Sequence, residues 1–189
     1  MTKKSKKLNK LIAKNKKKII KIALIVIGII IVAVACFYAA NAVDNNIRKD
    51  RIISIYNSLK IDDKKYIINY ESIFGEKRIY EWDSSRSYSS ERTYIRGANV
   101  DTTVAELKQA IAKTDFKFYE EPYPGSTDFM YIYKSPKNEY LRVSVESKTR
   151  QDDFFNRHNM GLPTEDVTTS PNAGPSNVTI KVNLDDNNE

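Results

Sequence analysis

Residues 22–43 form a run without a single charged side chain. A helix rises about 1.5 Å per residue, so this run makes a helix of roughly 33 Å, which matches the hydrocarbon core of a bilayer. The sequence therefore predicts one transmembrane helix over residues 22–43. The lipid bilayer is then the first partner of the chain, and any folded domain has to follow the helix.

The residues before this run set the direction in which the helix crosses. Residues 1–21 contain ten lysines and no acidic residue. Lysine-rich flanks stay on the cytoplasmic side of a membrane. We expect residues 1–21 to form a basic cytoplasmic tail, and the chain from residue 44 onward to be extracytoplasmic. The lysines nearest the membrane, which carry the orientation signal, are Lys16, Lys17, Lys18 and Lys21.

The positive charge of the whole chain belongs to this tail. The chain has 31 Lys and Arg residues against 24 Asp and Glu residues, a formal net charge of +7. Because no acid precedes residue 44, residues 44–189 hold 21 basic and 24 acidic residues. Nucleic-acid binding uses a strongly basic surface. We therefore expect no nucleic-acid partner for the outer domain.

Two kinds of processing compete with an uncleaved anchor. Residues 33–36 read Ala-Val-Ala-Cys, a loose lipobox in which Cys36 is the candidate for lipidation. The small-x-small triplets at residues 33–35 and 40–42 also fit cleavage by signal peptidase. The long basic region and the long apolar run favour the uncleaved anchor, in which Cys36 is a small apolar residue of the membrane helix.

Cysteine usage limits the chemistry of the outer domain. Cys36 is the only cysteine in the chain. The residues after the membrane helix therefore supply no internal disulfide, no thiolate metal site and no cysteine nucleophile. This usage fits a bacterial envelope protein.

The pattern of apolar residues after the membrane predicts an α+β domain over residues 44–156. We expect helices over residues 46–59 and 104–113, the second capped by Thr103 and Glu106. We expect strands over residues 66–74, 78–82, 93–96, 116–120, 129–133 and 140–146. A turn at residues 135–138 joins the last two strands as a hairpin. The result is a mainly antiparallel sheet packed against one or two helices.

The C-terminal part changes in composition. Residues 157–176 are rich in Pro, Gly, Thr, Ser and Asn, which predicts a flexible loop. Residues 178–184 alternate between apolar and polar side chains and predict a last strand at the edge of the sheet. The final strand and an acidic tail together make up residues 177–189.

Catalytic motifs are missing from the sequence. The one histidine, His158, has no cysteine or second histidine near it, which predicts a surface position. The adjacent acids at residues 62–63, 120–121 and 152–153 are typical of solvated surface, although a glycosidase also uses two carboxylates. No glycine-rich phosphate loop, nucleophile elbow or calcium loop is present. The sequence predicts a non-enzymatic protein without a cofactor or metal.

The aromatic residues are the more informative candidates for binding. The chain has 12 Tyr residues, and we expect most of them to fill the core. Trp82, Arg86 and Tyr88 stand in a polar segment, and Tyr123 stands between two prolines. We predict that these four residues form a surface for a protein or glycan partner, because Tyr, Trp and Arg dominate binding surfaces.

Two stretches carry a resemblance to a known group of proteins. They are SIFGEKRIYEWDSSRSYSSERTYIRGANVDTTVAELKQAI and EPYPGSTDFMYIYKS, with their pattern of Tyr, Gly and Arg. Residues 47–148 resemble single-pass membrane-anchored proteins of candidate-phylum bacteria of the Saccharibacteria type. That group carries no established activity, so the resemblance implies a location in the cell envelope.

Two functions of different classes fit these observations. The first is a non-enzymatic scaffold or binding module that meets an envelope partner, and inner-membrane scaffolds of type IV secretion systems share its plan of tail, helix and small outer domain. The second is an envelope carbohydrate-binding protein or hydrolase. A cleft that brings two carboxylates together over a tyrosine or tryptophan floor favours the second function.

Overall fold

The computed structural model describes residues 3–75, 88–120 and 129–184. The chain forms two compact units, residues 1–44 and residues 45–189. Helix α1 (Lys3–Ser58) makes up the described part of the first unit and continues into the second. Among the described residues, α1 is the one helix that is long and apolar enough to cross a membrane, and its apolar stretch is not buried by protein. This is compatible with a single-pass membrane anchor.

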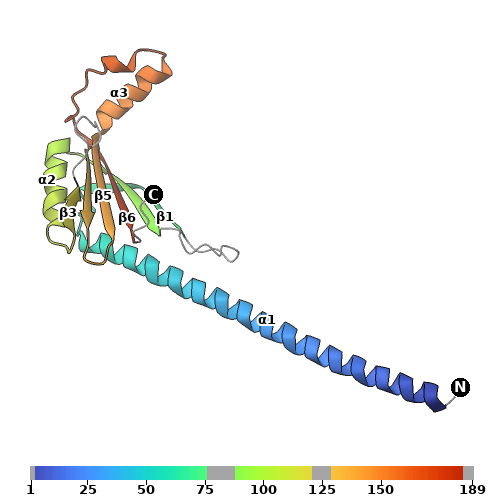
Figure 1. Cartoon of the computed structure of the whole chain (residues 1–189). Coiled ribbons are helices and arrows are strands. Elements are labelled where there is room, and N and C mark those ends of the chain that lie inside the picture. The colour runs from blue at the N-terminus through green and yellow to red at the C-terminus, as the bar shows by residue number, and fades with distance from the viewer. Residues whose placement is uncertain (1–2, 76–87, 121–128, 185–189) are drawn as a thin grey trace. The chain divides into compact units, whose positions relative to one another are not determined.

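The second unit is built on one antiparallel sheet of six strands, shown in Figure 1. The strand order is β1-β2-β6-β5-β4-β3. The strands are β1 (Tyr66–Phe74), β2 (Ser89–Arg96), β3 (Lys117–Glu120), β4 (Phe129–Lys134), β5 (Tyr140–Ser147) and β6 (Ser176–Asn183). With helices α2 (Val100–Ile111) and α3 (Lys148–Asn159) and the short 3-10 helix η1 (Thr164–Asp166), the unit is α+β. The predicted fold class is confirmed.

Strand β6 lies in the centre of the sheet, and its predicted place at the edge was wrong. It pairs with β2 on one side and with β5 on the other. Val178, Ile180 and Val182 point into the core and are fully buried. Their alternation with polar residues shows only that one face of the strand is covered, so it carries no information on the neighbours of the strand.

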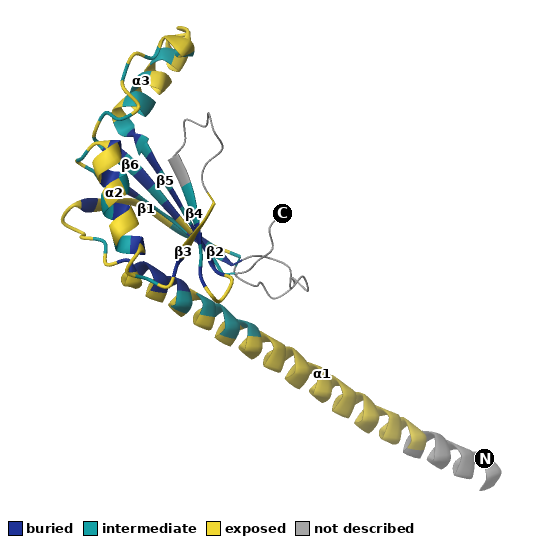
Figure 2. Cartoon of the chain, turned by 60° about the vertical axis from the view of Figure 1, so that its left-hand side comes forward, coloured by how far each residue is buried: buried dark blue, intermediate teal, exposed yellow. Residues whose placement is uncertain are grey.

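One face of the sheet is covered by the end of α1 and by α2, and the buried residues gather between these layers (Figure 2). α1 contributes Ile52, Ile55 and Tyr56 to the core, and Leu59, directly after its last residue, is buried with them. The Tyr56 hydroxyl donates to the carbonyl oxygen of Ile180 in β6 at 2.9 Å. The helix predicted over residues 46–59 is thus the C-terminal part of α1, and a hydrogen bond as well as apolar contact joins it to the central strand.

A partly buried ion pair also fixes the end of α1. Two nitrogens of the Arg51 guanidinium donate to the Glu139 carboxylate, at 2.5 and 2.7 Å, and the Ser135 hydroxyl donates to it at 2.8 Å. Glu139 closes the turn between β4 and β5, in which Asn138 has a φ of 62°. The hairpin predicted at this turn is confirmed. Arg51 thereby ties α1 to the β4–β5 turn.

Helix α2 begins earlier than predicted. The Asn99 side chain caps it by accepting a hydrogen bond from the Thr102 backbone amide at 3.0 Å. Thr103, predicted as the cap, lies inside the helix and donates from its hydroxyl to the Asn99 carbonyl oxygen. Glu106 binds other residues instead of completing a capping box. Asn and Thr are both good cap residues, so the sequence offered two starting points.

The strand predicted over residues 66–74 is β1, and its antiparallel partner in the structure is β2. β1 pairs with β2, with Tyr66 opposite Arg96 and Phe74 opposite Ser89. β2 starts earlier than the strand expected over residues 93–96. The strand predicted over residues 78–82 lies outside the described residues.

Helix α3 was not predicted. It begins directly after β5, where the Ser147 side chain accepts a hydrogen bond from the Arg150 backbone amide. It reaches into the range predicted as a flexible loop, and η1 lies within the same range. None of the residues of α3 is buried. A helix that buries nothing lacks the apolar periodicity by which helices are recognised in a sequence.

Candidate functional site

The residues predicted to orient and modify the anchor lie on the first unit. Lys16, Lys17, Lys18 and Lys21 are exposed along α1. Cys36 is also exposed on α1, as a free thiol among exposed apolar side chains. The exposed apolar surface of this helix is what a lipid-facing segment requires, and both roles stay predictions.

The predicted partner surface of four aromatic and basic residues does not assemble among the described residues. Tyr88 is 1% exposed and belongs to the core, so its ring offers no surface to a partner. It lies directly before β2, which places it against the buried residues of the sheet. Trp82, Arg86 and Tyr123 lie outside the described residues.

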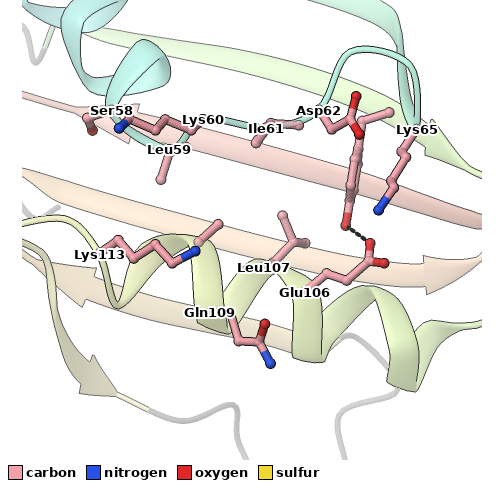
Figure 3. A pocket seen from close by; sticks show the side chains of 12 residues that line it. Ser58, Leu59, Lys60, Ile61, Asp62, Lys65, Glu106, Leu107, Gln109 and Lys113 are labelled. Carbon is pink, nitrogen blue, oxygen red and sulfur yellow. Dashed lines mark hydrogen bonds between the residues drawn. The ribbon is translucent and has the colours of Figure 1, made fainter.

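A pocket of about 420 Å³ opens at the connection between α1 and β1, beside α2. Figure 3 shows Leu59, Ile61 and Leu107 forming an apolar lining between the two segments. Lys65 stands at one end of the pocket, and Lys60 and Lys113 stand at the other. The volume falls in the range of small-molecule sites. The pocket combines an apolar lining with cationic ends.

Among the described residues, the lysines of this pocket form no close ion pair, although the charge of Lys65 helps to lower the pKa of Glu106. Within the described parts of the chain, the amines of Lys60, Lys65 and Lys113 form no ion pair. Of the two carboxylates in the lining, Asp62 accepts a hydrogen bond from the Lys64 backbone amide at 3.0 Å. The other, Glu106, is bound by an arginine outside the pocket. With Glu106 paired, the remaining net charge of the pocket lining is positive, which favours the binding of an anionic group.

Glu106 is held by two neighbouring strands. The Arg96 fork donates two hydrogen bonds to its carboxylate, both of 3.0 Å, and the Tyr66 hydroxyl donates a third of 2.9 Å (Figure 3). The bonds from Arg96 lower the pKa of Glu106, and the bond from Tyr66 adds to this against the opposing effect of burial. Burial and the contact with Glu106 raise the pKa of Tyr66. Glu106 is therefore an ionised structural link between α2 and the sheet.

The electrostatics of Glu106 do not fit the role of a general acid. A general acid in a glycosidase needs a carboxyl whose pKa is raised, whereas the pKa of Glu106 is lowered. His158 lies exposed on α3, stacked on the Phe154 ring with centroids 6.5 Å apart. Within the described ranges, no group of three or more His, Cys, Asp or Glu residues could hold a metal ion.

The pocket was missed in the sequence because its residues come from two separate segments. Lys60 and Lys65 flank a short connection, and Lys113 follows α2. Each of these lysines looks like an ordinary solvated side chain in its own segment. Only the packing of α2 beside the end of α1 brings them around one pocket.

Known proteins add nothing to this description. The chain matches no protein-family model, and no curated protein or solved structure matches it.

Proposed function

We propose that this chain is a single-pass bacterial membrane protein, with its N-terminus in the cytoplasm and residues 44–189 outside, whose outer domain is a non-enzymatic binding or scaffold module of the cell envelope. The observation that carries this proposal is the pocket beside α2, with its apolar lining and unpaired lysines. It supports recognition of an anionic group on an envelope protein or glycan.

Two further points support a binding role. The lowered pKa of Glu106 keeps this carboxyl of the pocket lining ionised, so it is no proton donor at neutral pH. The plan of a basic tail, one membrane helix and a small α+β domain is also that of inner-membrane scaffolds in type IV secretion systems. An anchored domain of this kind acts by holding a partner at the membrane surface.

In-cell photocrosslinking tests the binding role. A photoreactive amino acid at Gln109, which lines the pocket, should capture a recurrent partner, whereas the same group at the exposed Lys181 of β6 should not. The double substitution Lys60→Gln and Lys113→Gln should remove the Gln109 product because it removes two of the three positive charges of the lining. Equal capture at Gln109 and Lys181, or a product that survives the double substitution, rejects the pocket as the binding site.

Protease digestion tests the orientation of the chain in the membrane. Protease added outside intact spheroplasts should digest residues 44–189 and spare an N-terminal tag. Replacing Lys16, Lys17, Lys18 and Lys21 by Gln should yield a mixed population, because these lysines adjoin the membrane. Protection of the outer domain in the unchanged protein contradicts the proposed topology.

One observation favours the alternative of an envelope carbohydrate-binding protein or hydrolase, lipid-anchored at Cys36. The pocket has two carboxylates, Asp62 and Glu106, beside Tyr66. For this alternative, Glu106→Gln should abolish hydrolysis of cell-wall glycan by the full chain, and Cys36→Ala should remove a lipid from the mature protein. Mass spectrometry of the mature protein distinguishes a lipidated Cys36 from an intact N-terminus.

A further inference from the structure

Strand β1 forms one edge of the six-stranded sheet. The strand order places β1 and β3 at the two opposite margins, as Figure 1 shows. Among the described residues, β1 pairs with β2 on one side and with no strand on the other. Half of its backbone N–H and C=O groups therefore point away from the sheet. Such an edge is a template on which another extended strand can form hydrogen bonds.

The two edges differ in how well they are protected against pairing. β3 has four residues, carries charged side chains at both ends, Lys117 and Glu120, and is interrupted by a register shift between Phe118 and Glu120. Short, charged and bulged edges resist pairing with another chain. β1 has nine residues and contains neither Lys nor Pro. The edge at β1 is therefore the less protected of the two.

A bulge also divides β1, and it leaves one regular segment. The register with β2 shifts between Ile68 and Tyr70, and it then runs without interruption from Tyr70 to Phe74. Tyr70 and Phe74 are each 48% exposed. Ile73 packs against the core, so by the alternation of a strand Tyr70 and Phe74 lie on the face that α1 and α2 leave uncovered. The regular part of the edge thus presents two exposed aromatic side chains on one face.

The charge on β1 is neutralised within the chain. β1 carries a single charged side chain, Glu71, which accepts a hydrogen bond from Nε of Arg92 at 2.7 Å. A second nitrogen of the Arg92 guanidinium lies 2.6 Å from the same oxygen. Arg92 is itself held over the Tyr56 ring, 4.1 Å from its centroid. Because like charges on opposed strands are destabilising, this pairing lets a second strand of the same sequence approach β1 without repulsion.

A second copy of β1 meets every requirement of this edge. The occupant has to be an extended strand, because only a strand satisfies a row of backbone donors and acceptors. It has to bring no unpaired charge, and it has to cover the exposed aromatic side chains. β1 of a second copy has all three properties, and its own edge is open in the same way. Antiparallel pairing about a two-fold axis therefore closes both edges with a single contact.

The position of the two-fold axis follows from the bulge and the charges. Ser72 is the centre of the regular segment from Tyr70 to Phe74. With the axis at Ser72, Tyr70 of one copy lies opposite Phe74 of the other, and Glu71 lies opposite Ile73. Aromatic side chains in opposite positions stabilise a pair of antiparallel strands. An axis at Glu71 would instead set two carboxylates opposite each other.

From this geometry we infer that the protein forms a symmetric dimer in which two β1 strands pair antiparallel around Ser72. The sheets of the two copies then form one continuous sheet. The same surface is used on both copies, so the contact closes on itself and builds no larger assembly. This contact uses neither the lysine pocket nor an envelope partner. It goes beyond the proposed function and is tested separately from it.

Crosslinking at the two-fold axis tests the contact directly. Full chains carrying Cys36→Ala are reconstituted in phosphatidylcholine liposomes with one added cysteine, either Ser72→Cys or Lys181→Cys. A short bismaleimide should join the Ser72→Cys chains roughly tenfold more than the Lys181→Cys chains, because only a residue at the axis adjoins its own copy. Lys181 is the control because its side chain is 51% exposed on the central strand β6. Equal yields from the two variants overturn the inference.

A second measurement distinguishes this contact from association through the membrane helix. The dissociation constant of the full-chain dimer in detergent should rise roughly tenfold for Tyr70→Lys, and it should stay unchanged for Tyr119→Lys. Tyr119 is a matched control, a tyrosine with 56% exposure on the opposite edge strand β3.

A rescue experiment tests the register. Phe74→Glu added to Tyr70→Lys should restore the dimer, because the two new charges lie opposite each other only across the two-fold axis. Within one chain these two positions are four residues apart on the strand, roughly 13 Å, which is too far for an ion pair. A dimer that is indifferent to Tyr70→Lys, a failed rescue, or a chain that is monomeric throughout contradicts the inference.

Discussion

Helices α2 and α3 both have 12 residues, but α2 packs into the core and α3 does not. α2 buries Val100, Thr103, Leu107 and Ile111 against the sheet. α3 buries none of its residues, although it contains two phenylalanines. A helix of this length is marginal in water unless tertiary contacts support it. α2 therefore owes its stability to packing, and α3 owes its own to its cap and to the polar contacts of its loop.

The difference shows which apolar residues serve the fold and which lie outside the core. Removing a side chain from the buried face of α2 leaves a cavity, whereas Phe155 of α3 is 59% exposed and its removal leaves none. Regions that lack buried contacts also open more readily than the core. We expect α3 to open locally at low free energy, and α2 to open only with the whole domain.

The largest contrast should come from one truncation in each helix. Leu107→Ala should lower the free energy of unfolding by about 2–5 kcal/mol, because Leu107 is 3% exposed in the core. Phe155→Ala should change the free energy of unfolding by less than about 0.5 kcal/mol, because the Phe155 side chain is 59% exposed. Urea unfolding of the full chain in micelles measures both values. Similar losses in the two variants would mean that α3 packs as α2 does.

Acid should weaken the attachment of α1 and α2 to the sheet. Glu139, which binds Arg51 of α1, and Glu106 of α2 both have pKa values below their ordinary range in the folded state. For Glu106 the hydrogen bonds from Arg96 are the main cause; for Glu139, burial raises the pKa but the bonds from Arg51 and Ser135 outweigh it. A carboxylate with a lowered pKa stabilises the fold above its unfolded pKa, and this contribution is lost as the pH falls through the folded pKa.

Hydrogen exchange at a series of acidic pH values tests this expectation. Protection of the α2 amides should begin to fall below the ordinary pKa of a glutamate, where the unfolded chain binds protons, and should fall further as the pH passes the lowered pKa values of Glu106 and Glu139 in the folded state. In Glu106→Gln the pH dependence should be shallower, since one of the two groups is gone. A pH profile of α2 that is identical in the variant and the unchanged protein contradicts the role assigned to Glu106.

The smallest contrast concerns the caps. Asn99→Ala and Ser147→Ala each remove one capping hydrogen bond, worth about 1 kcal/mol. In α2 the loss should appear in global unfolding, whereas in α3 it should appear only as faster exchange of the helix amides. Asn99→Ser and Ser147→Thr keep a capping oxygen without adding a charge at the buried Ser147 and serve as controls. A global loss from Ser147→Ala would show that α3 is coupled to the core.

The same contrast explains what the sequence could predict. The alternation of Leu141, Val143 and Val145 predicted β5 and the side that it buries, because a covered strand face has a period of two. α3 escaped prediction because Phe154 and Phe155 are adjacent and share no helical periodicity with buried positions. Tyr88 was predicted as surface from its polar neighbours, yet its ring is buried, because tertiary packing overrides local composition.

The candidate sites depend on tertiary structure in the same way. Lys60 and Lys113 meet at one pocket only because α2 lies beside the end of α1. Phe116 and Phe118 looked like ordinary strand residues, and the pocket between them and α2 follows from the position of β3 at the sheet edge. A periodic pattern describes one element at a time, so it predicts faces and not the sites where elements meet.

The central position of β6 has a consequence for how the protein is made. β2 and β5 each have β6 as a neighbour, so the six-stranded sheet stays divided until the chain up to Asn183 has been synthesised. At roughly 5–20 residues per second, the stretch between Arg96 and Ser176 delays closure on the order of several seconds after β2 emerges. During that interval the inner edges of two half-sheets are unpaired, and other chains can pair with them. The last strand to be synthesised is therefore the strand that completes the sheet and removes this risk.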